Sequence, residues 1–313
     1  MNRRRVLFIC ENHCGSDTFR MRIGRVCQMR PGFHRGMPAK LRPLSTFPNA
    51  VRRGIRCVLC DIDDTLTIDG RLTSSAYAAM ERLSRAGLAV VPVTGRPAGW
   101  CDLIARQWPV TGVIGENGAF YFRYAPAERR VVRQFWFDDE RRQADRARLA
   151  VLAEAILSAV PAAALASDQR YRETDLAIDW CEDVARLSQA EIDRIVALAE
   201  DAGATVRVSS IHINIWFGEF SKLSMTRRFI DDVFAAETWN DARAFVFVGD
   251  SPNDSTMFSF FENSVGVANV LNFRGAIETE PTYVTAGMGG DGFAELGDAL
   301  LSAQQSGRAG QAT

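Results

Sequence analysis

Three aspartates stand within four residues, at Asp61, Asp63 and Asp64, where the apolar run 55–62 ends. Carboxylates this close repel one another, and burying an unpaired carboxylate is costly unless a cation lies among them. Mg²⁺ prefers oxygen ligands of this kind, completed by water and phosphate. The cluster therefore predicts a divalent-metal site. The alternative is a solvated acidic turn in which Asp64 or Thr65 caps a helix.

A second group of polar residues follows another apolar run of the sequence. Asp250, Asn253 and Asp254 come directly after the expected strand 244–248 and its glycine. If this strand lies beside the first one, the carboxyl ends of both meet at one edge of the sheet, and Asp250 arrives next to Asp61 and Asp63. Asp254 has a second interpretation, as an ordinary acid in the first turn of a helix.

Hydrogen-bond donors and cations lie between the two acidic groups in the sequence. Thr94, Gly95 and Arg96 follow a third apolar run and offer a hydroxyl, a backbone amide and a guanidinium. The chain has only two lysines, Lys40 and Lys222, and Lys222 stands near an expected helix start. A phosphoryl group needs positioned hydrogen bonds and cations, so these residues are candidates for phosphate binding. A lone threonine or lysine, however, is most often a surface residue.

Short apolar runs alternate with helical patterns after residue 54, which is typical of a parallel sheet covered by helices. This part predicts strands at 55–62, 88–93, 110–114, 244–248 and 264–268, and helices at 73–86, 98–107, 221–235 and from 252. The middle of the chain predicts strands at 119–124, 131–137, 176–180, 205–208 and 211–217, and helices at 138–159 and 188–202. We therefore expect a Rossmann-like doubly wound α/β core, 53–118 and 219–301, with an inserted α+β domain at 119–218.

Residues 1–52 differ from the rest of the chain in composition. The first 56 residues hold thirteen Lys and Arg against two acids, whereas the remainder holds 24 against 36. Several prolines and the lack of a sustained period predict a basic, unstructured arm. The small polar tail 302–313 is expected to fray. A nucleic-acid tether is the functional alternative, but the arm lacks the interleaved aromatic residues of such surfaces, so nucleic acid is not an expected partner.

The sequence also bears on the location of the protein. No run reaches the eighteen apolar residues that a membrane span requires, and the apolar stretch 6–10 is too short for a signal peptide. Seven cysteines in a chain without an export signal favour reduced thiols over a disulfide framework. We therefore expect a cytoplasmic protein without a membrane partner. The sequence leaves its oligomeric state open.

Four motifs in this order resemble those of the haloacid dehalogenase (HAD) superfamily of hydrolases. The resemblance is closest to the Cof-like and sucrose-phosphatase-like branch, subfamily IIB, which has a large α+β cap, and it extends over about residues 55–300. The motifs are Asp61-x-Asp63-x-Thr65, Val93-Thr94-Gly95-Arg96, Lys222 and Gly249-Asp250-x-x-Asn253-Asp254. The turns 115–118 and 289–292 are similar to accessory turns of this branch. Asp64 and Leu223 stand where glycine is common in relatives, which bears on specificity more than on activity.

The resemblance implies a Mg²⁺-dependent phosphatase that acts on a small phosphate ester. Asp61 would be the nucleophile that forms an aspartyl-phosphate, and Asp63 the general acid and base. Mg²⁺ would be held by Asp61, the backbone carbonyl of Asp63 and Asp250, with support from Asp254. The residues expected to bind the phosphoryl group are Thr94, Gly95, Arg96, Lys222 and Asn253.

The polar positions of two cap strands give a hypothesis about the leaving group. His212 and Asn214 alternate with aliphatic residues in 211–217, and Asp175 and Asp179 alternate in the same way. We expect these four side chains to form a polar roof over the site, suited to a hydroxyl-rich leaving group and above all to a sugar phosphate. The alternative is a polar face that lies toward solvent or at a hairpin edge.

Two other functions remain open at this point. One is a sugar phosphomutase, because relatives with this activity share the cap type; it would depend on a bisphosphate activator. The other is a non-catalytic binding protein of the same fold, which would contact RNA or another anionic partner through its basic arm.

Overall fold

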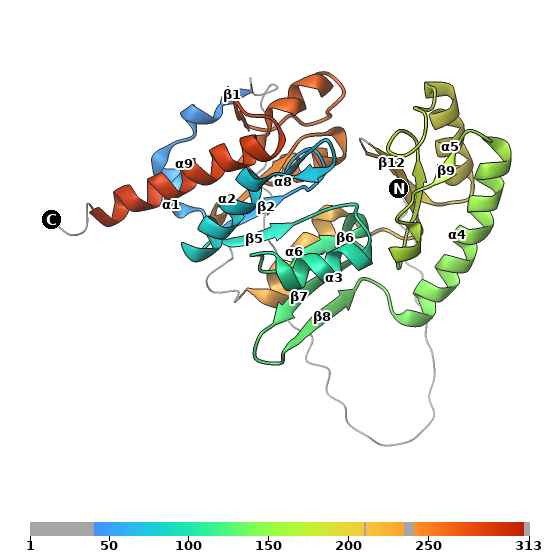
Figure 1. Ribbon diagram of the computed structural model, residues 1–313, viewed down its shortest axis with the longest axis horizontal. Coiled ribbons are helices and arrows are strands. Elements are labelled where there is room, and N and C mark those ends of the chain that lie inside the picture. The colour runs from blue at the N-terminus through green and yellow to red at the C-terminus, as the bar shows by residue number, and fades with distance from the viewer. Residues whose placement is uncertain (1–40, 210, 235–240, 310–313) are drawn as a thin grey trace, which may run out of the picture.

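The computed structural model describes residues 41–209, 211–234 and 241–309, which form two lobes, a core and a cap (Figure 1). The core contains a six-stranded sheet of order β1-β15-β14-β13-β2-β5, in which all neighbouring strands are parallel. Its strands are β1 (Arg42–Pro43), β2 (Cys57–Cys60), β5 (Ala89–Pro92), β13 (Phe245–Gly249), β14 (Ser264–Gly266) and β15 (Tyr283–Val284). The predicted parallel α/β core is confirmed.

Helices cover both faces of this sheet. They are α1 (Asn49–Gly54), α2 (Ser74–Arg85), α3 (Ala98–Gln107), α6 (Lys222–Val233), α8 (Ser255–Phe260) and α9 (Gly289–Ala309). Successive residues of a strand point to opposite faces, and β2 contributes to both. Val58 and Cys60 pack with residues of α2 and α9, whereas Cys57 and Leu59 pack with residues of α6 and α8. The central strands are therefore buried on both sides.

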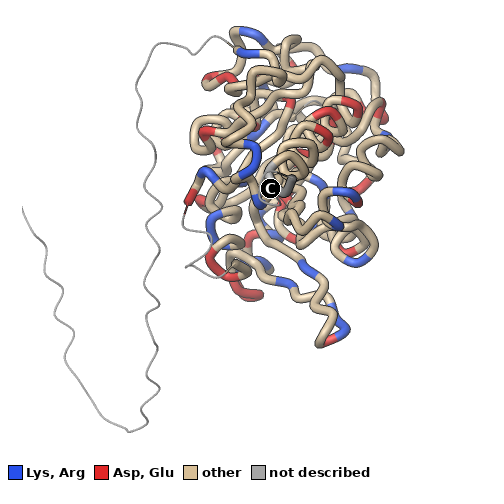
Figure 2. Tube along the Cα trace, turned by 90° about the vertical axis from the view of Figure 1, so that its left-hand side faces the viewer, with Lys and Arg blue, Asp and Glu red and all other residues tan. Residues whose placement is uncertain are grey.

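A second, antiparallel sheet extends the core. It consists of β6 (Val113–Gly115), β7 (Phe120–Ala125) and β8 (Arg130–Phe135), and a parallel bridge between Val93 and Ile114 joins it to the end of β5. The sequence placed the hairpin 119–137 in the inserted domain, but its aromatic residues are buried in the core, where Phe120 stacks on Phe122. The hairpin projects from the lower edge of the molecule (Figures 1 and 2).

The cap is an antiparallel sheet of order β11-β12-β10-β9 with two helices. Its elements are β9 (Ala164–Leu165), β10 (Leu176–Asp179), β11 (Thr205–Val208), β12 (His212–Trp216), α4 (Asp139–Ala159) and α5 (Gln189–Asp201). Ile213 and Ile215 pack with residues of both helices. The alternate residues of β12 therefore lie on the opposite face of the cap sheet. An inserted α+β layer, as predicted, thus exists, but it begins after β8.

Residues 41–52 belong to the core, so the predicted end of the basic arm at residue 52 is wrong. β1 pairs with β15, Leu44 and Phe47 are buried, and the Phe47 ring stacks on Tyr283 with centroids 4.5 Å apart. Pro43 and Pro48, two of the prolines that suggested an irregular arm, instead directly precede the 3-10 helix Leu44–Thr46 and α1. Residues 1–40 lie outside the described residues.

The chain also stays helical beyond the predicted start of the frayed tail. α9 continues through residues 302–309, Ala303 is buried, and the Gln304 amide donates to the Ile55 carbonyl at 3.4 Å. The predicted turn 289–292 is the first turn of this helix. A Cβ on Gly290 would lie 2.0 Å from Thr73 Oγ1, so glycine allows the helix start to approach α2 closely.

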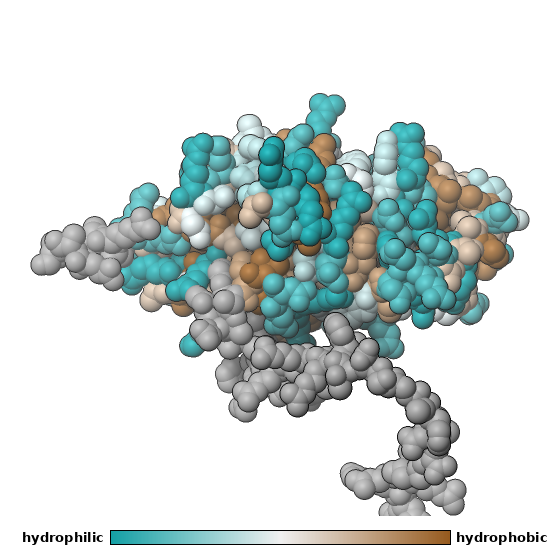
Figure 3. All heavy atoms as spheres, turned by 90° about the horizontal axis from the view of Figure 1, so that it is seen from below, coloured by the Kyte–Doolittle hydropathy of each residue, from teal (hydrophilic) through white to brown (hydrophobic). Residues whose placement is uncertain are grey.

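The remaining elements are short. A small hairpin follows the first motif, with strands β3 (Thr67–Ile68) and β4 (Arg71–Leu72). The 3-10 helices are Leu44–Thr46, Glu116–Gly118, Gln169–Tyr171, Ala242–Ala244, Pro252–Asp254 and Ala268–Phe273. Basic and acidic residues are intermingled on the face shown in Figure 2, and hydrophilic side chains dominate the face shown in Figure 3. Within the described ranges, no helix has both the length and the apolar character of a membrane span.

Candidate active site

The predicted motif residues meet at the carboxyl edge of the core sheet. β2 lies between β13 and β5, so Asp61, Asp250 and Thr94, which follow these strands, leave the sheet at the same edge. The Asp61 N–H donates to the Val248 carbonyl at 2.9 Å and holds the turn after β2 against β13. The parallel pairing therefore brings together groups that are far apart in the sequence.

Lys222 joins two of the acids. Its Nζ donates to Asp61 Oδ1 at 2.8 Å and to Asp254 Oδ1 at 2.9 Å, and its side chain is 4% exposed. The lysine is the first residue of α6, where Ser221 and Ser224 form a capping box that fixes the start of the helix. Burial acts to lower the lysine pKa, but the two carboxylates outweigh it and raise the pKa.

Three buried carboxylates form a cluster beside this lysine. Asp61, Asp250 and Asp254 each offer an oxygen within 4.8 Å of those of the other two. Burial raises the pKa of Asp61 to about 7, although Lys222 acts in the opposite direction. Burial, with the charges of Asp61 and Asp254, raises the pKa of Asp250 as well. Among the described side chains, the Asp250 carboxylate receives a hydrogen bond from the Thr65 hydroxyl, at 3.2 Å.

A divalent cation fits this cluster. Three buried carboxylates face one ammonium, so the cluster has an excess of negative charge that a cation would neutralise. Carboxylate oxygens, completed by water and phosphate, are the ligands that Mg²⁺ uses. Asp63 is the predicted metal residue whose carboxylate lies outside the cluster; the sequence assigned only its backbone carbonyl to the metal.

The Asp63 side chain faces Arg96 instead. Nε of Arg96 donates to both Asp63 carboxylate oxygens, at 2.9 and 3.0 Å, and Nη2 lies 2.8 Å from Oδ1. The guanidinium is buried and stacks on Trp100, 4.5 Å from the ring centroid. Arg96, predicted to bind substrate, is therefore engaged by a carboxylate of the protein in this arrangement.

The cap reaches the same guanidinium through Glu182, which the sequence did not single out. Arg96 Nη2 donates to Glu182 Oε1 at 2.8 Å, and Glu182 Oε2 lies 2.8 Å from His212 Nε2. The contacts with His212 and then Arg96 lower the pKa of Glu182 to about 2. A line of contacts through Asp63, Arg96, Glu182 and His212 thus connects the core with the cap.

Only part of the predicted polar roof faces the site. His212 and Asn214 line a small cavity together with Asp61 and Asp63. Asp179 lies outside this lining, because its carboxylate accepts the backbone N–H groups of residues 181–183 at 2.8–3.0 Å. The loop after β10 needs these acceptors, since its N–H groups have no strand partner.

Asp175 is likewise used inside the protein. It pairs with Arg172 at 3.0 Å and accepts a hydrogen bond from Asn214 Nδ2 at 3.1 Å. Arg172 in turn donates to the Gly95 carbonyl at 2.9 Å, so Asp175 supports a contact between cap and core. The roof hypothesis is therefore wrong for Asp175 and Asp179, which do not line the cavity.

The other predicted phosphate-binding residues lie at the same strand ends. Gly95 and Asn253 line the small cavity. A Cβ on Gly95 would lie 3.2 Å from the Asn117 side chain, so a side chain here would crowd the cavity wall. Thr94 is buried, and its hydroxyl accepts the Arg96 N–H at 3.0 Å. Asp64, where relatives often have glycine, has φ 58°, a conformation that aspartate tolerates better than most residues.

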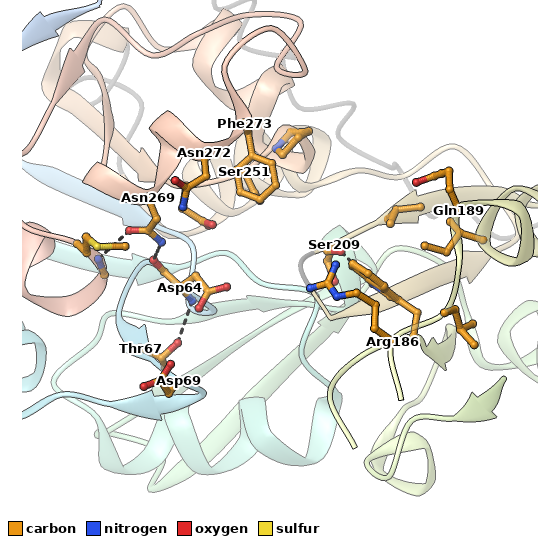
Figure 4. A pocket seen from close by; sticks show the side chains of 18 of the residues that line it. Asp64, Thr67, Asp69, Arg186, Gln189, Ser209, Ser251, Asn269, Asn272 and Phe273 are labelled. Atoms are coloured by element: carbon orange, nitrogen blue, oxygen red, sulfur yellow. Dashed lines mark hydrogen bonds between the residues drawn. The ribbon is translucent and has the colours of Figure 1, made fainter. Parts of the chain in front are cut away.

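Two spaces of different size adjoin the site. The cavity over Asp61 measures about 20 Å³, room for about one water molecule, so the cap is closed over Asp61. A groove of about 960 Å³ lies between core and cap. Ser209 and Ser251 line both spaces. In Figure 4, Asp64, Ser251 and Asn269 border the groove on the core side, and Arg186 extends into it from the cap side.

Glu116 connects the two lobes. The sequence predicted the turn 115–118 but did not single out Glu116 as a functional residue. The carboxylate is fully buried and accepts hydrogen bonds from core and cap alike. Its donors are the backbone N–H groups of Ala98 at 2.9 Å, Glu173 at 2.9 Å, Thr174 at 2.7 Å and Asp175 at 3.2 Å, and the Thr174 hydroxyl. An acid within a Gly-rich turn was the available signal, but its cap partners lie more than fifty residues away in sequence.

The comparisons with known proteins agree with the fold and with the motifs. Residues 58–135 match the family described as haloacid dehalogenase-like hydrolase. The fold is similar to that of a protein from Thermoplasma acidophilum, with a TM-score of 0.62 and 17% identity over 79% of this chain and 98% of that one. None of the curated proteins matches the chain in sequence.

Two further solved structures have the same fold. A HAD/COF-like hydrolase from Plasmodium vivax gives a TM-score of 0.59 at 15% identity, over 80% of this chain and 96% of that one. The sucrose-phosphatase from Synechocystis sp. PCC6803, solved with sucrose and phosphate, gives 0.56 at 14% identity, over 79% and 98%. The predicted resemblance to the Cof-like and sucrose-phosphatase-like branch is confirmed at the level of the fold.

Proposed function

Because residues 58–135 match the haloacid dehalogenase-like hydrolases and the fold agrees, we propose that the chain is a Mg²⁺-dependent phosphatase that hydrolyses a small phosphomonoester through an aspartyl-phosphate on Asp61. The observation that carries the proposal is the buried cluster of Asp61, Asp250 and Asp254 around Lys222, beside a cavity that Asp63 and Asn253 also line. The cluster combines a nucleophile, a site for a cation and a fixed ammonium at one strand edge.

The first step forms the covalent intermediate. A carboxylate oxygen of Asp61 attacks the phosphorus atom, the bond to the leaving oxygen breaks, and Asp63 gives its proton to that oxygen. Mg²⁺, when bound among the acids, reduces the negative charge on the phosphoryl oxygens and on the nucleophile. The ammonium of Lys222 supplies a second positive charge and orients Asp61 through their 2.8 Å hydrogen bond.

The second step releases phosphate. Asp63, now ionised, takes a proton from a water molecule, which attacks the phosphorus atom of the aspartyl-phosphate and restores Asp61. In the closed arrangement Asp63 is held by Arg96, so its carboxylate must exchange this contact for the leaving oxygen. Movement of the cap can assist this exchange, because Glu182 of the cap binds the same guanidinium.

We further propose a sugar phosphate as the substrate. His212 and Asn214 place polar groups over Asp61, which suits a hydroxyl-rich leaving group. A sucrose-phosphatase with this fold was solved with sucrose and phosphate, which supports the same class. The cytoplasmic location stays a prediction.

Phosphate release from sugar phosphates, polyol phosphates, phosphoglycolate and nucleotides tests the proposal, measured with Mg²⁺ and with EDTA. We expect turnover that depends on Mg²⁺ and that falls by about a thousandfold or more in Asp61→Asn. The matched control is Asp201→Asn, which changes an exposed aspartate at the end of α5 and should keep wild-type rates. Release by Asp61→Asn at the wild-type rate would refute Asp61 as the nucleophile, and no release from any compound would refute the phosphatase.

A further inference from the structure

Arg186 is a cation in the groove that the proposed chemistry does not use. Its guanidinium lies over the Trp180 ring, 4.5 Å from the centroid. No ion pair joins it to a carboxylate of the described residues. Figure 4 shows the side chain extending from the cap into the groove, next to Ser209. Stacking on the indole restrains the guanidinium, so less conformational entropy is lost when it binds a ligand.

The groove is the space available to the leaving group of a substrate. The cavity at Asp61 measures about 20 Å³, whereas the adjoining groove measures about 960 Å³. Ser209 and Ser251 line both, so they mark where the two spaces meet. When the phosphoryl group of an ester reaches Asp61, the rest of the molecule must therefore extend past these serines into the groove.

Charge is distributed unevenly along this groove. Acidic residues of the core side, Asp64 and Asp250, line it near the catalytic cluster, where a cation is also expected. On the cap side Arg186 is the only basic residue among the described lining residues. Asp193, the acid of α5 that lines the groove, receives the Gln189 amide at 2.8 Å. The groove thus offers one site for an anion at its cap side, away from the acidic cluster.

We propose that Arg186 binds a second anionic group on the leaving group of the substrate, a carboxylate or a second phosphate. This inference rests on the proposed phosphatase and narrows its substrate class to phosphomonoesters whose remainder is itself anionic. A guanidinium donates two parallel hydrogen bonds to either anion, so both share one recognition chemistry. Leu187 and Phe273 add apolar surface to the wall of the same groove.

The test measures binding and does not depend on turnover. In the Asp61→Asn background with Mg²⁺, calorimetry compares glucose 6-phosphate with 6-phosphogluconate, which adds a carboxylate, and fructose 6-phosphate with fructose 1,6-bisphosphate, which adds a phosphate. In at least one pair, we expect the compound with the added carboxylate or phosphate to bind about tenfold more tightly than the compound without it. Arg186→Met should remove this ratio, and Arg186→Lys should keep part of it because the charge remains.

Arg194→Met is the matched control, since Arg194 is an exposed arginine of α5, in the same lobe as Arg186, that does not line the groove. The Arg194→Met variant should keep the wild-type ratio of affinities within each ligand pair. The pair in which the ratio appears identifies the second anion as carboxylate or phosphate. Equal binding within both pairs, or a ratio that survives Arg186→Met, would overturn the inference. Phosphate release by the wild-type protein is measured separately, so failure of the phosphatase proposal stays distinct from failure of the anion site.

Discussion

Lys222 supplies the positive charge that balances the buried carboxylates of Asp61 and Asp254. It lies within 2.9 Å of both Asp61 and Asp254, and all three side chains are buried. Removing one member of a buried ion pair leaves an uncompensated charge, which costs more than the pair contributes. Lys222→Met should therefore destabilise the protein by about 3 kcal/mol, measured by urea unfolding in EDTA.

A double-mutant cycle separates this effect from lost packing. If the unpaired carboxylate is the cause, adding Asp254→Asn to Lys222→Met should recover part of the lost stability, so that the two changes are clearly non-additive. The surface substitution Arg194→Met should change stability by less than about 0.5 kcal/mol. Additive losses in the cycle would mean that Lys222 contributes mainly through packing.

At the residue scale the sequence predicted that the acidic cluster and Lys222 meet at one sheet edge, but it did not predict the groups around them. Asp61, Asp250 and Lys222 could be found because each stands at a strand or helix end, a position that a periodic pattern marks. Glu182 and Glu116 could not, because their partners are set by how cap and core pack together. Asp179 looked like a roof residue, and only the shape of the following loop shows that it binds backbone N–H groups.

Among the elements, the turn Glu116–Gly118 and the start of α6 touch backbone to backbone. Gly118 has φ 105°, and a Cβ there would lie 2.1 Å from the Ser221 carbonyl oxygen. An alanine at position 118 would strain the backbone there and displace Ser221, the residue that precedes Lys222. We expect Gly118→Ala to cost about 3 kcal/mol or more in the free energy of unfolding and to lower phosphatase activity.

Gly203→Ala provides the comparison. Gly203 also has a positive φ, 74°, but nothing lies within 4 Å of the added Cβ. This substitution should cost only about 1 kcal/mol, which is the backbone strain alone, and should leave activity unchanged. Equal costs for the two alanines would show that the contact with Ser221 does not constrain the site.

Glu116 makes the connection between turn and cap dependent on pH. Burial, assisted by the charge of Asp175 and opposed by Arg172, raises its pKa to about 7 from a usual value of 4.5. Cys101 is the other titratable group that interacts with it. Between these two pH values the folded state keeps a proton that the unfolded state loses, so the stability from this group falls as the pH rises from 4.5 to 7.

Glu116→Gln removes this titration. The melting temperature of the wild type minus that of the variant should therefore fall between pH 4.5 and pH 7 and become constant above that range. Thermal unfolding at closely spaced pH values measures it. A difference that stays constant, or grows with pH, would contradict the assignment to Glu116.

Pattern strength decided which elements could be predicted. The helix 98–107 was predicted with the bounds of α3, and long periodic segments such as α4 were found within a residue. β1 and β15 have two residues each, too few for a period to appear. The hairpin β7–β8 was predicted as strands but assigned to the wrong lobe, because its aromatic residues are equally compatible with either core.

On the scale of the whole molecule, the cap and core are joined by buried charge. Arg96 bonds to Asp63 of the core and to Glu182 of the cap, and Arg172 of the cap donates to the Gly95 carbonyl of the core. Exposing polar contacts to water costs less free energy than exposing an apolar interface, because water replaces the lost hydrogen bonds. Such a boundary can therefore open and close. The 20 Å³ cavity is too small for a phosphate ester, and the cap must therefore move for substrate to enter.

The sequence predicted two lobes with the chemistry at one sheet edge, which follows from the alternation of strands and helices. It could not predict the closed arrangement, because the line from Asp63 to His212 depends on the relative position of the lobes. It also misjudged both ends of the core. Phe47 and Ala303 lie in segments without a sustained hydrophobic period, and only tertiary packing reveals that they are buried.

Trapping of the covalent intermediate tests the central claim, that Asp61 is the nucleophile of a phosphatase. The protein is mixed with Mg²⁺ and a phosphate ester that it hydrolyses, quenched in acid within one turnover and analysed by peptide mass spectrometry. We predict a phosphorylated peptide whose modification maps to Asp61 and that is absent in Asp61→Asn. Phosphate release without modification of Asp61, or modification of another residue, would contradict the account.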